Sequence, residues 1–367
     1  MDILALALAT GLLALHLCSC LIVALRPKTG FLPWTGTPPR VTLLRPVCGL
    51  DPQESAALAS SFTLDYPALE LIFCVADADD PVIAPLTALM AQHRQVRARL
   101  LCGEDRLSAN PKLNNLAKGW DAAEGRFVVM ADSNLLLPPD YIWRLLEASG
   151  PGVGLVSCPP VGAEARGIWG ALECAFLNSN QARLQLTADA FGMGFAQGKT
   201  MMWDREFLNR AGGIQALGRH LAEDVSATHL VRGAGLRVAL PSAPFIQPIG
   251  RRSFAQVWGR QLRWSKVRRD GFLGLFAIEP LNGAIIPLGL AAFGGGPVVA
   301  LALVALWYGA EAALARRQGW MTQWREVALF GLRDALIPLI WAASLRSTAF
   351  EWRGNAMARG SLQKLPG

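Results

Sequence analysis

Hydrophobic residues are concentrated at the two ends of the chain. Residues 3–25 include no charged side chain, and about 20 apolar residues are enough for a helix to cross the hydrocarbon core of a membrane. A secretory signal peptide is the alternative, but its positively charged start is missing because the chain opens Met1-Asp2. Arg26 and Lys28 follow the stretch, as basic residues do on the cytoplasmic side of a span. We therefore expect residues 1–26 to be a retained anchor.

Three more apolar stretches lie toward the other end, at residues 275–293, 297–315 and 327–345. Three consecutive glycines, 294–296, predict a tight hairpin between the first two stretches. The third stretch contains Arg333 and Asp334, and such charges face protein or water rather than lipid.

Basic clusters border these stretches and suit cytoplasmic loops, at residues 266–269 and 316–317. We expect interfacial and transmembrane helices over residues 266–346 and a basic tail over residues 347–367. A strict count of four membrane crossings would place this tail on the side of the membrane away from the cytoplasm. One re-entrant segment would change that count, and the sequence leaves both possibilities open.

Between the two ends, short apolar runs alternate with helix-like stretches. Runs that predict buried strands are residues 41–44, 69–76, 96–101 and 127–131. Helix-like residues follow the first run at 53–62 and the second up to residue 92. This alternation predicts a parallel sheet with helices on both faces. In such sheets ligands bind beyond the carboxyl ends of the strands.

Acidic residues follow two of these predicted strands. Asp77 and Asp80 come after the second strand, and Asp132 directly follows the fourth. A carboxylate at a strand end, with a polar residue such as Asn134 two positions on, can hold a hard divalent cation beside a diphosphate. Asp77 and Asp80 could accept hydrogen bonds from a nucleotide. The alternative for all three acids is an ordinary turn or helix cap.

Three further features could take part in chemistry. Lys112 could neutralise a phosphate. Glu223 and Asp224 are adjacent acids that open a helix-like stretch, where they could complement the helix dipole or, in a cleft, take a proton from an attacking hydroxyl. A helix face just before the membrane segments could bind a diphosphate and stack on a sugar or lipid head group, or lie on the membrane surface. That face consists of Arg260, Arg263 and Trp264.

Composition narrows the class of protein. Only 17% of the 367 residues are charged and 52% are hydrophobic, whereas soluble domains carry roughly a quarter of charged residues. This balance excludes intrinsic disorder and argues against a wholly soluble protein. The net charge is +7, but the basic residues gather near the membrane segments, which favours anionic lipid over nucleic acid.

The order of these motifs resembles that of family 2 glycosyltransferases and, more narrowly, the ceramide glucosyltransferase family. The resemblance covers about residues 38–270 and the layout of the apolar segments. The stretches that carry it include LLRPVCGLDP, LDYPALELIFCVADADDP, NPKLNNLAKGWDAAEGRFVVMADSN and HLAEDVSATHLVRGAGLRVAL. It implies a cytoplasmic GT-A (Rossmann-like) catalytic domain over residues 38–265, with one N-terminal and about three C-terminal membrane helices.

The resemblance also implies a reaction. A hexose, glucose in the first place, would pass with inversion from a UDP-sugar to the primary hydroxyl of a membrane lipid, ceramide in the first place. Asp224 would be the general base, and Mg or Mn held by Asp132 would stabilise the leaving UDP. The UDP-sugar would be bound by Arg45, Pro46, Cys48, Asp77, Asp80, Lys112 and Asp132. Closure over the donor phosphates and the acceptor would involve Glu223, Arg260, Arg263 and Trp264.

Three positions depart from the family pattern. The triplet that begins at Asp132 ends in Asn134 rather than in a second aspartate, so metal ligation would rest mainly on Asp132. Residues 176–183, near the expected acceptor site, lack the histidine of animal ceramide enzymes. Cys48 stands where related sequences often carry a basic residue.

Other functions are compatible with parts of the pattern. A hopanoid-associated glycosyltransferase of a bacterial inner membrane would use the same acids, with UDP-N-acetylglucosamine or another UDP-sugar as donor. A polysaccharide synthase carries similar RxxRW motifs, but four apolar segments are few for a polymer channel. An inactive membrane adaptor is the alternative from another class, and the retained acids argue against it.

Overall fold

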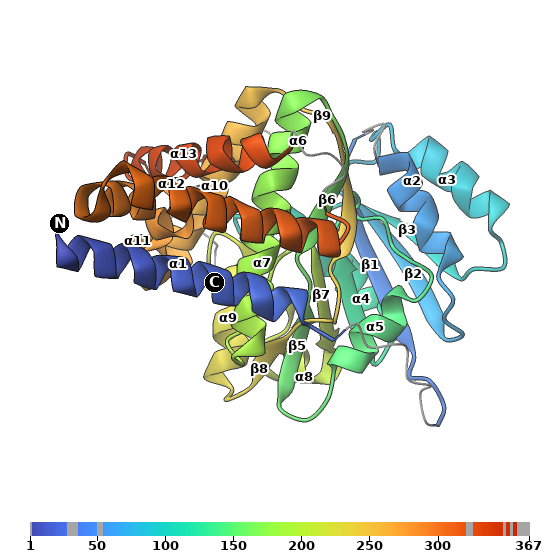
Figure 1. Cartoon of the computed structure of the whole chain (residues 1–367). Helices are drawn as coiled ribbons and strands as arrows, with labels where there is room; N and C mark the ends of the chain where they lie inside the picture. Colours follow the sequence, from blue (N-terminus) through green and yellow to red (C-terminus); the bar gives the residue numbers. More distant parts are fainter. Residues whose placement is uncertain are drawn as a thin grey trace. The chain divides into compact units, whose positions relative to one another are not determined.

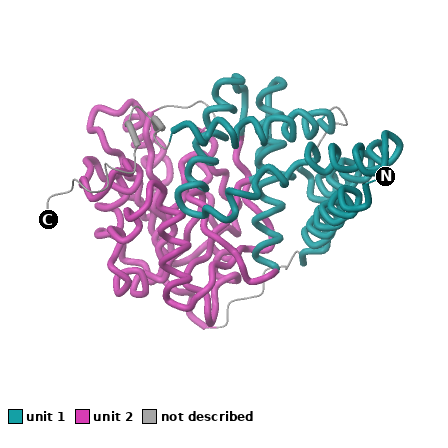
Figure 2. The backbone as a smooth tube through the Cα atoms, turned by 90° about the vertical axis from the view of Figure 1, so that its left-hand side faces the viewer, with its two compact units in different colours: residues 1–27, 161–190, 249–348 teal, residues 28–160, 191–248, 349–367 magenta. Residues whose placement is uncertain are grey.

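The computed structural model describes residues 2–27, 36–49, 54–320 and 326–347, together with the backbone of two short strands, β10 (Phe350–Trp352) and β11 (Asn355–Met357). Residues 50–52 of the first quoted motif lie outside the described residues, as does most of the expected basic tail. The chain forms two compact units, shown in Figure 2. Unit 1 comprises Met1–Pro27, Val161–Ala190 and Ile249–Thr348, and unit 2 comprises Lys28–Pro160, Phe191–Pro248 and Ala349–Gly367.

Unit 2 is built on a seven-stranded sheet (Figure 1). Its strands, in spatial order, are β3 (Ala98–Cys102), β2 (Leu69–Val75), β1 (Val41–Val47), β4 (Phe127–Ala131), β7 (Thr200–Asp204), β5 (Val153–Ser157) and β8 (Arg237–Ala239). The first four are the predicted strands, and they are parallel. The expectation of a wholly parallel sheet is wrong, because β7 runs antiparallel to both β4 and β5.

Helices cover both faces of this sheet. Successive residues of a strand point to opposite faces, and both faces of β1, β2 and β4 are buried because nearly every residue in them is apolar. On one face, Gly119 of α4 (Pro111–Ala122) lies so close to Cys74 that an added Cβ would be 2.5 Å from its sulfur. The opposite face packs against α3 (Ile83–Gln92) and α5 (Tyr141–Ala148). The carboxyl ends of β1, β2 and β4 are left at one edge.

Further short helices complete unit 2. They are α2 (Glu54–Ala59) with the 3-10 helix η1 (Ser60–Thr63), α8 (Arg205–Arg210), the 3-10 helix η3 (Ile214–Gly218) and α9 (Glu223–Gly233). The predicted helix at 53–62 is thus an α-helix that tightens into a 3-10 turn. The strands β6 (Pro160–Arg166) and β9 (Phe245–Arg251) pair in a separate two-stranded sheet.

Unit 1 is helical. Its elements are α1 (Ile3–Ala24), α6 (Gly167–Ala175), the π-helix η2 (Phe176–Ala182), α7 (Arg183–Ala190), α10 (Phe254–Gly271), α11 (Leu273–Ala277), the 3-10 helix η4 (Glu279–Asn282), α12 (Ile285–Arg317) and α13 (Glu326–Ser344). Among the described residues, three helices are long and apolar enough to cross a membrane, namely α1, α12 and α13. The protein is a membrane protein.

The second predicted span, residues 275–293, is not one continuous helix. It is divided among α11, η4 and the first part of α12, because Pro280 and Gly283 interrupt the helical pattern. The glycine run does interrupt α12: Gly296 has φ 80° and ψ −179°. Ala284 N and Tyr308 Oη, from before and after this break, both bond to Asp334 Oδ2, at 2.8 and 3.2 Å. The two parts of α12 therefore lie side by side, as the predicted hairpin requires.

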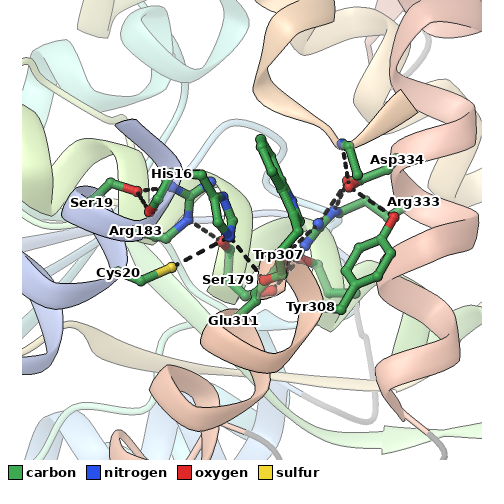
Figure 3. A network of polar contacts seen from close by, with 12 residues as sticks. His16, Ser19, Cys20, Ser179, Arg183, Trp307, Tyr308, Glu311, Arg333 and Asp334 are labelled. Carbon is green, nitrogen blue, oxygen red and sulfur yellow. Dashed lines mark hydrogen bonds and ion pairs between the residues drawn. The ribbon is translucent and has the colours of Figure 1, made fainter. Parts of the chain in front are cut away.

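A buried charge network connects the helices of unit 1 (Figure 3). Arg333 of α13 pairs with Glu311 of α12, and its Nε donates to Asp334 Oδ1 at 2.8 Å. Arg333, Glu311 and Asp334 are all fully buried, which confirms that the charges of the third C-terminal stretch face protein. Arg333 also donates to Ser179 Oγ of η2 at 2.9 Å, so the network anchors η2 to the membrane helices.

We expect Glu311→Gln to destabilise unit 1 by about 3 kcal/mol, the scale for breaking a buried ion pair. The variant leaves part of the charge of buried Arg333 without its partner. Thermal unfolding in detergent measures the change. The matched control is Glu206→Gln, which removes an exposed i,i+4 pair with Arg210 and should change stability by less than about 0.5 kcal/mol. A loss of stability in Glu311→Gln as small as that of the control would contradict a stabilising role of the network.

Candidate active site

The candidate site lies at the carboxyl end of β4, where β7 begins beside it. The two strands are antiparallel with Ala131 opposite Thr200, so the residues just beyond them, Asp132 and Lys199, are also neighbours. Asp132 N donates to the carbonyl oxygen of Lys199 at 3.1 Å. The sheet itself therefore places a lysine next to the predicted donor-binding aspartate.

Two lysines hold the Asp132 carboxylate. Lys112 Nζ is 2.7 Å from Asp132 Oδ1, and Lys199 Nζ is 2.9 Å from Asp132 Oδ2. Burial by itself raises the pKa of Asp132, but the two ammonium groups outweigh it and hold the pKa well below its usual range. Asp132 is therefore ionised at every physiological pH.

Lys112 connects Asp132 to a second acid. It lies in the first turn of α4, which begins at the Asn110 cap with Pro111 as its first residue. Its Nζ is 2.8 Å from Glu223 Oε1 and 2.5 Å from the carbonyl oxygen of Gly198. Burial lowers the pKa of Lys112, but the two carboxylates raise it above its ordinary value. Lys112 is therefore a permanent positive charge between them.

Glu223 and Asp224 begin α9 and turn their carboxylates to different partners. Glu223 accepts a hydrogen bond from Asn110 Nδ2 at 2.7 Å, in addition to Lys112. Asp224 accepts from Gly198 N at 3.0 Å and from Val225 N at 2.8 Å. A larger residue at position 198 would displace the Glu223 carboxylate, because an added Cβ would lie 2.6 Å from Glu223 Oε1. The backbone of Gly198 thus contacts Lys112 through its carbonyl oxygen and Asp224 through its amide.

Asp224 has the electrostatics of a proton acceptor at neutral pH. Burial and then the neighbouring Glu223 carboxylate raise its pKa to about 7, against the lowering effects of the Gly198 amide and Lys112. Its side chain remains partly exposed. A carboxylate with a pKa near the working pH that a substrate can reach is suited to general base catalysis.

Asp77 and Asp80, the other acids predicted to bind the UDP-sugar, accept hydrogen bonds from main-chain amides. Asp80 accepts from Gly49 N through both oxygens, at 3.1 and 2.9 Å, and from Val82 N at 2.9 Å. It ties the loop after β1 to the start of α3, beside exposed Cys48 and half-buried Pro46. Asp77 is exposed and accepts from Asp79 N at 2.9 Å. Their predicted contacts with a nucleotide stay predictions.

Arg45 lies beneath the site rather than on its surface. It is 1% exposed, and burial lowers its pKa to about 10. Its Nη2 donates to the carbonyl oxygens of Asp132 and Leu135 at 2.7 and 3.0 Å, and its Nη1 donates to Ala57 O and Ser61 Oγ, both at 2.7 Å. These contacts make Arg45 a support for the Asp132 loop.

The RxxRW residues lie on α10, which belongs to unit 1. Arg260 forms an ion pair with Glu173 of α6, a fully buried acid. Arg263 and Trp264 are half-buried on the same helix. Closure of these three residues over a donor in unit 2 stays a prediction.

Four residues of these arrangements are absent from the sequence-based candidates: Asn110, Gly198, Lys199 and Glu173. The Asn-Pro pair that caps α4 and the lone acid in the apolar stretch of α6 are local signals that could have suggested Asn110 and Glu173. Lys199 has no such signal, because only the pairing of β7 with β4 brings it to Asp132.

Comparison with known proteins decides the family. The family model described as glycosyl transferase family 21 matches residues 3–363. The chain belongs to glycosyl transferase family 21. This confirms the ceramide glucosyltransferase resemblance and the glycosyltransferase activity, with a nucleotide sugar as donor.

Curated relatives of this family 21 enzyme are named ceramide glucosyltransferases. Ceramide glucosyltransferase 1 of Caenorhabditis elegans is 26% identical over 332 residues, which cover 87% of this chain and 71% of the relative. Ceramide glucosyltransferase of Komagataella phaffii is 27% identical over 304 residues, covering 67% and 60% of the two chains. A solved mannosyltransferase of Pyrobaculum calidifontis, in complex with GDP-Man and Mn2+, superposes with a TM-score of 0.50 at 20% identity over 90% of this chain and 99% of its own. The predicted GT-A fold is confirmed.

Proposed function

We propose that this enzyme transfers glucose, with inversion, from UDP-glucose to the primary hydroxyl of ceramide and so forms a β-linked glycolipid. The names of its curated relatives support ceramide and glucose as the substrates. The inverting mechanism rests on the arrangement of the candidate site.

One observation carries the proposal. A single ammonium group contacts both Asp132, which is predicted to bind the sugar donor, and Glu223, the neighbour of the predicted general base. Lys112 Nζ lies 2.7 Å from Asp132 and 2.8 Å from Glu223, and Asp224 is the next residue. Donor diphosphate and acceptor hydroxyl must meet at one sugar carbon. The fold places the residues proposed for each in a single cluster, although they come from three separate parts of the sequence.

The proposed reaction is a direct displacement at C1 of the sugar. The acceptor oxygen forms a bond to C1 as its proton passes to an oxygen of Asp224, and the bond from C1 to the β-phosphate oxygen breaks with its electron pair leaving on UDP. Attack opposite the leaving group converts an α-linked donor into a β-linked product. The main-chain amides of Gly198 and Val225 fix the Asp224 carboxylate. The carboxylate is therefore oriented before the reaction begins.

Negative charge develops on the diphosphate as the bond breaks. Preformed positive charge at that place lowers the barrier, because it stabilises the transition state more than the ground state. Lys112 is the proposed source of this charge. Its two carboxylate partners keep it protonated despite its burial, and they hold it in place before the donor arrives.

A divalent cation at Asp132 is the sequence-based expectation, and the mannosyltransferase of similar fold was solved with Mn2+. The side chains around Asp132 do not fit one in their present arrangement. Both of its oxygens accept from lysine ammonium groups, and the described residues include no group of three or more His, Cys, Asp or Glu that could hold a metal ion. The proposed steps therefore use only the residues of the chain.

The membrane placement is also part of the proposal. The catalytic domain at residues 38–265 would lie on the cytoplasmic side, where UDP-sugars are made, with α1, α12 and α13 in a bacterial inner membrane. Arg260, Arg263 and Trp264 would then face the donor phosphates and the acceptor lipid at the membrane surface. The basic residues that border the apolar segments support this orientation.

The rate of transfer should rise with pH and level off above about pH 7. Asp224 accepts a proton only when it is ionised, and its pKa is raised to about 7. Below this pH we expect kcat/KM for the UDP-sugar to fall about tenfold per pH unit, because kcat/KM reports the pKa values of the free enzyme. A pH series with saturating lipid measures it. A profile that stays flat down to about pH 5 would contradict a base with a raised pKa.

A donor and acceptor screen tests the substrates. The purified enzyme in detergent receives UDP-glucose or UDP-N-acetylglucosamine, each with ceramide, a hopanoid or a phospholipid, and UDP release and lipid products are followed. Turnover with UDP-glucose and ceramide supports the proposal. Turnover confined to a hopanoid with UDP-N-acetylglucosamine would keep the reaction and replace its substrates. No turnover with any pair would count against transfer to lipid.

A further inference from the structure

We propose that the Lys199 ammonium group is the built-in cation of the donor site, so that this enzyme binds its donor diphosphate and transfers sugar without a divalent metal. The inference rests on the proposed function and concerns the same site. It assigns to Lys199 a role in donor binding that the sequence motifs do not suggest.

The position of Lys199 carries the inference. Its Nζ lies 2.9 Å from Asp132 Oδ2 and 2.9 Å from Asn134 Oδ1. These are the first and third residues of the Asp-Ser-Asn triplet that follows β4. They are also the two side chains that a divalent cation at this strand end was expected to meet. The ammonium group thus bridges the two side-chain oxygens between which the metal was expected.

The backbone fixes this placement. Lys199 directly precedes β7, and its carbonyl oxygen accepts from Asp132 N at 3.1 Å. The antiparallel pairing of β7 with β4 continues from this point, with Ala131 opposite Thr200. The lysine therefore starts from a fixed position, and its side chain is 13% exposed. Its ammonium group is part of the sheet edge rather than of a mobile surface.

The charges near the triplet fit an ammonium group better than a dication. Asn134 contributes a neutral amide oxygen, which leaves Asp132 as the single carboxylate of the triplet. Lys112 already pairs with the other oxygen of Asp132. A divalent cation bound at Asp132 would face two ammonium groups at short range, and like charges in a partly buried site repel strongly. A lysine needs no second carboxylate, and lysines commonly bind phosphates as point charges.

Together the two lysines would flank the diphosphate. Lys112 comes from α4 and Lys199 from the start of β7, and they reach the two oxygens of Asp132 from different elements. On donor binding, phosphate oxygens would share these ammonium groups with Asp132. The positive charge beside the diphosphate would then be supplied by the chain itself.

Metal binding and UDP binding test the inference in the full-length protein. Binding of Mn2+ is followed by its electron paramagnetic resonance signal in the presence of UDP, and binding of UDP by calorimetry in EDTA. We expect the wild type to bind UDP equally well with EDTA or Mn2+ and to leave the Mn2+ signal that of the free ion. Lys199→Met should weaken UDP binding in EDTA about 10- to 100-fold, the scale of one or two charge-assisted hydrogen bonds.

A variant that exchanges the lysine for a metal site gives the sharper result. Lys199→Met combined with Asn134→Asp supplies two carboxylates and removes the competing charge, so it should bind Mn2+ and recover UDP affinity only when Mn2+ is present. Lys199→Arg, which keeps the charge, should retain most UDP affinity in EDTA. Lys118→Met is the matched control, because Lys118 lies on α4 but bonds only to Asn115 in its described contacts.

The outcomes separate the inference from the proposed function. If wild-type UDP binding and sugar transfer are lost in EDTA and restored by Mn2+, the inference is wrong and the proposed function stands. If the Asn134→Asp single variant, which keeps Lys199, already binds Mn2+ tightly, the lysine does not exclude metal and the inference is also overturned. A wild type that binds no UDP under any condition would contradict the proposed function itself.

Discussion

Replacing Asp224 with asparagine is expected to lower the rate of sugar transfer by about 10²- to 10⁴-fold, the usual contribution of a general base. Asparagine has nearly the same shape as aspartate, and its Oδ1 can accept from Gly198 N or Val225 N as the carboxylate does. It cannot take the acceptor's proton. UDP affinity should remain near that of the wild type, because Asp224 bonds to backbone amides and not to Lys112 or Lys199.

Single-turnover kinetics and UDP calorimetry on the same preparation measure both quantities. Asp140→Asn is the matched control: Asp140 forms a half-buried i,i+4 pair with Arg144 away from the candidate site, and its loss should leave transfer unchanged. The pH dependence adds a second readout, since the residual activity of Asp224→Asn should lack the rise toward about pH 7. Transfer at a near-normal rate would show that another group is the base.

Lys112→Met is expected to have the second largest effect, a fall in kcat/KM of about 10²- to 10³-fold, comparable to the loss of one preorganised donor to a transition-state anion. Lys112 contacts Asp132, Glu223 and the carbonyl oxygen of Gly198. Without it, two carboxylates face each other in a largely buried cluster, and Lys199 is the one of the two lysines that still offers positive charge to the donor diphosphate.

The same substitution is also expected to destabilise the fold, because removing one partner of a buried ion pair lowers the free energy of unfolding by about 3–5 kcal/mol. The double variant Lys112→Met with Glu223→Gln removes the uncompensated charge and should recover much of the stability but not the activity. Lys118→Met, on the same helix, should leave both unchanged. Recovery of activity in the double variant would reduce Lys112 to a structural role.

The elements that the sequence predicts well are those with local signals. The strands β1, β2 and β4 are mostly apolar runs, and α1 is a charge-free stretch of membrane length. Asp132 could be placed at a strand end because it directly follows such a run. Asp224 could be singled out because two adjacent acids open a helix, and its raised pKa then depends on the burial that the fold supplies.

What the sequence does not predict depends on pairings between distant segments. Lys199 reaches Asp132 because β7 joins the sheet antiparallel to β4, and a short strand gives no signal of its direction. Arg45 was expected near the nucleotide, but its guanidinium lies under the Asp132 loop, where it holds carbonyl oxygens. Arg260 finds its acidic partner Glu173 in a helix far earlier in the chain. In each case the residue type suggested a role, but the residue's contact partner could not be predicted from the sequence.

The configuration of the product tests the central claim most directly. The purified enzyme is supplied with UDP-glucose and ceramide, and the anomeric proton of the isolated glycolipid is examined by nuclear magnetic resonance. Direct displacement with Asp224 as the base predicts a β-linked glucose on the primary hydroxyl, formed about 10²- to 10⁴-fold more slowly by Asp224→Asn. An α-linked product, or transfer of glucose to water alone, would contradict the account.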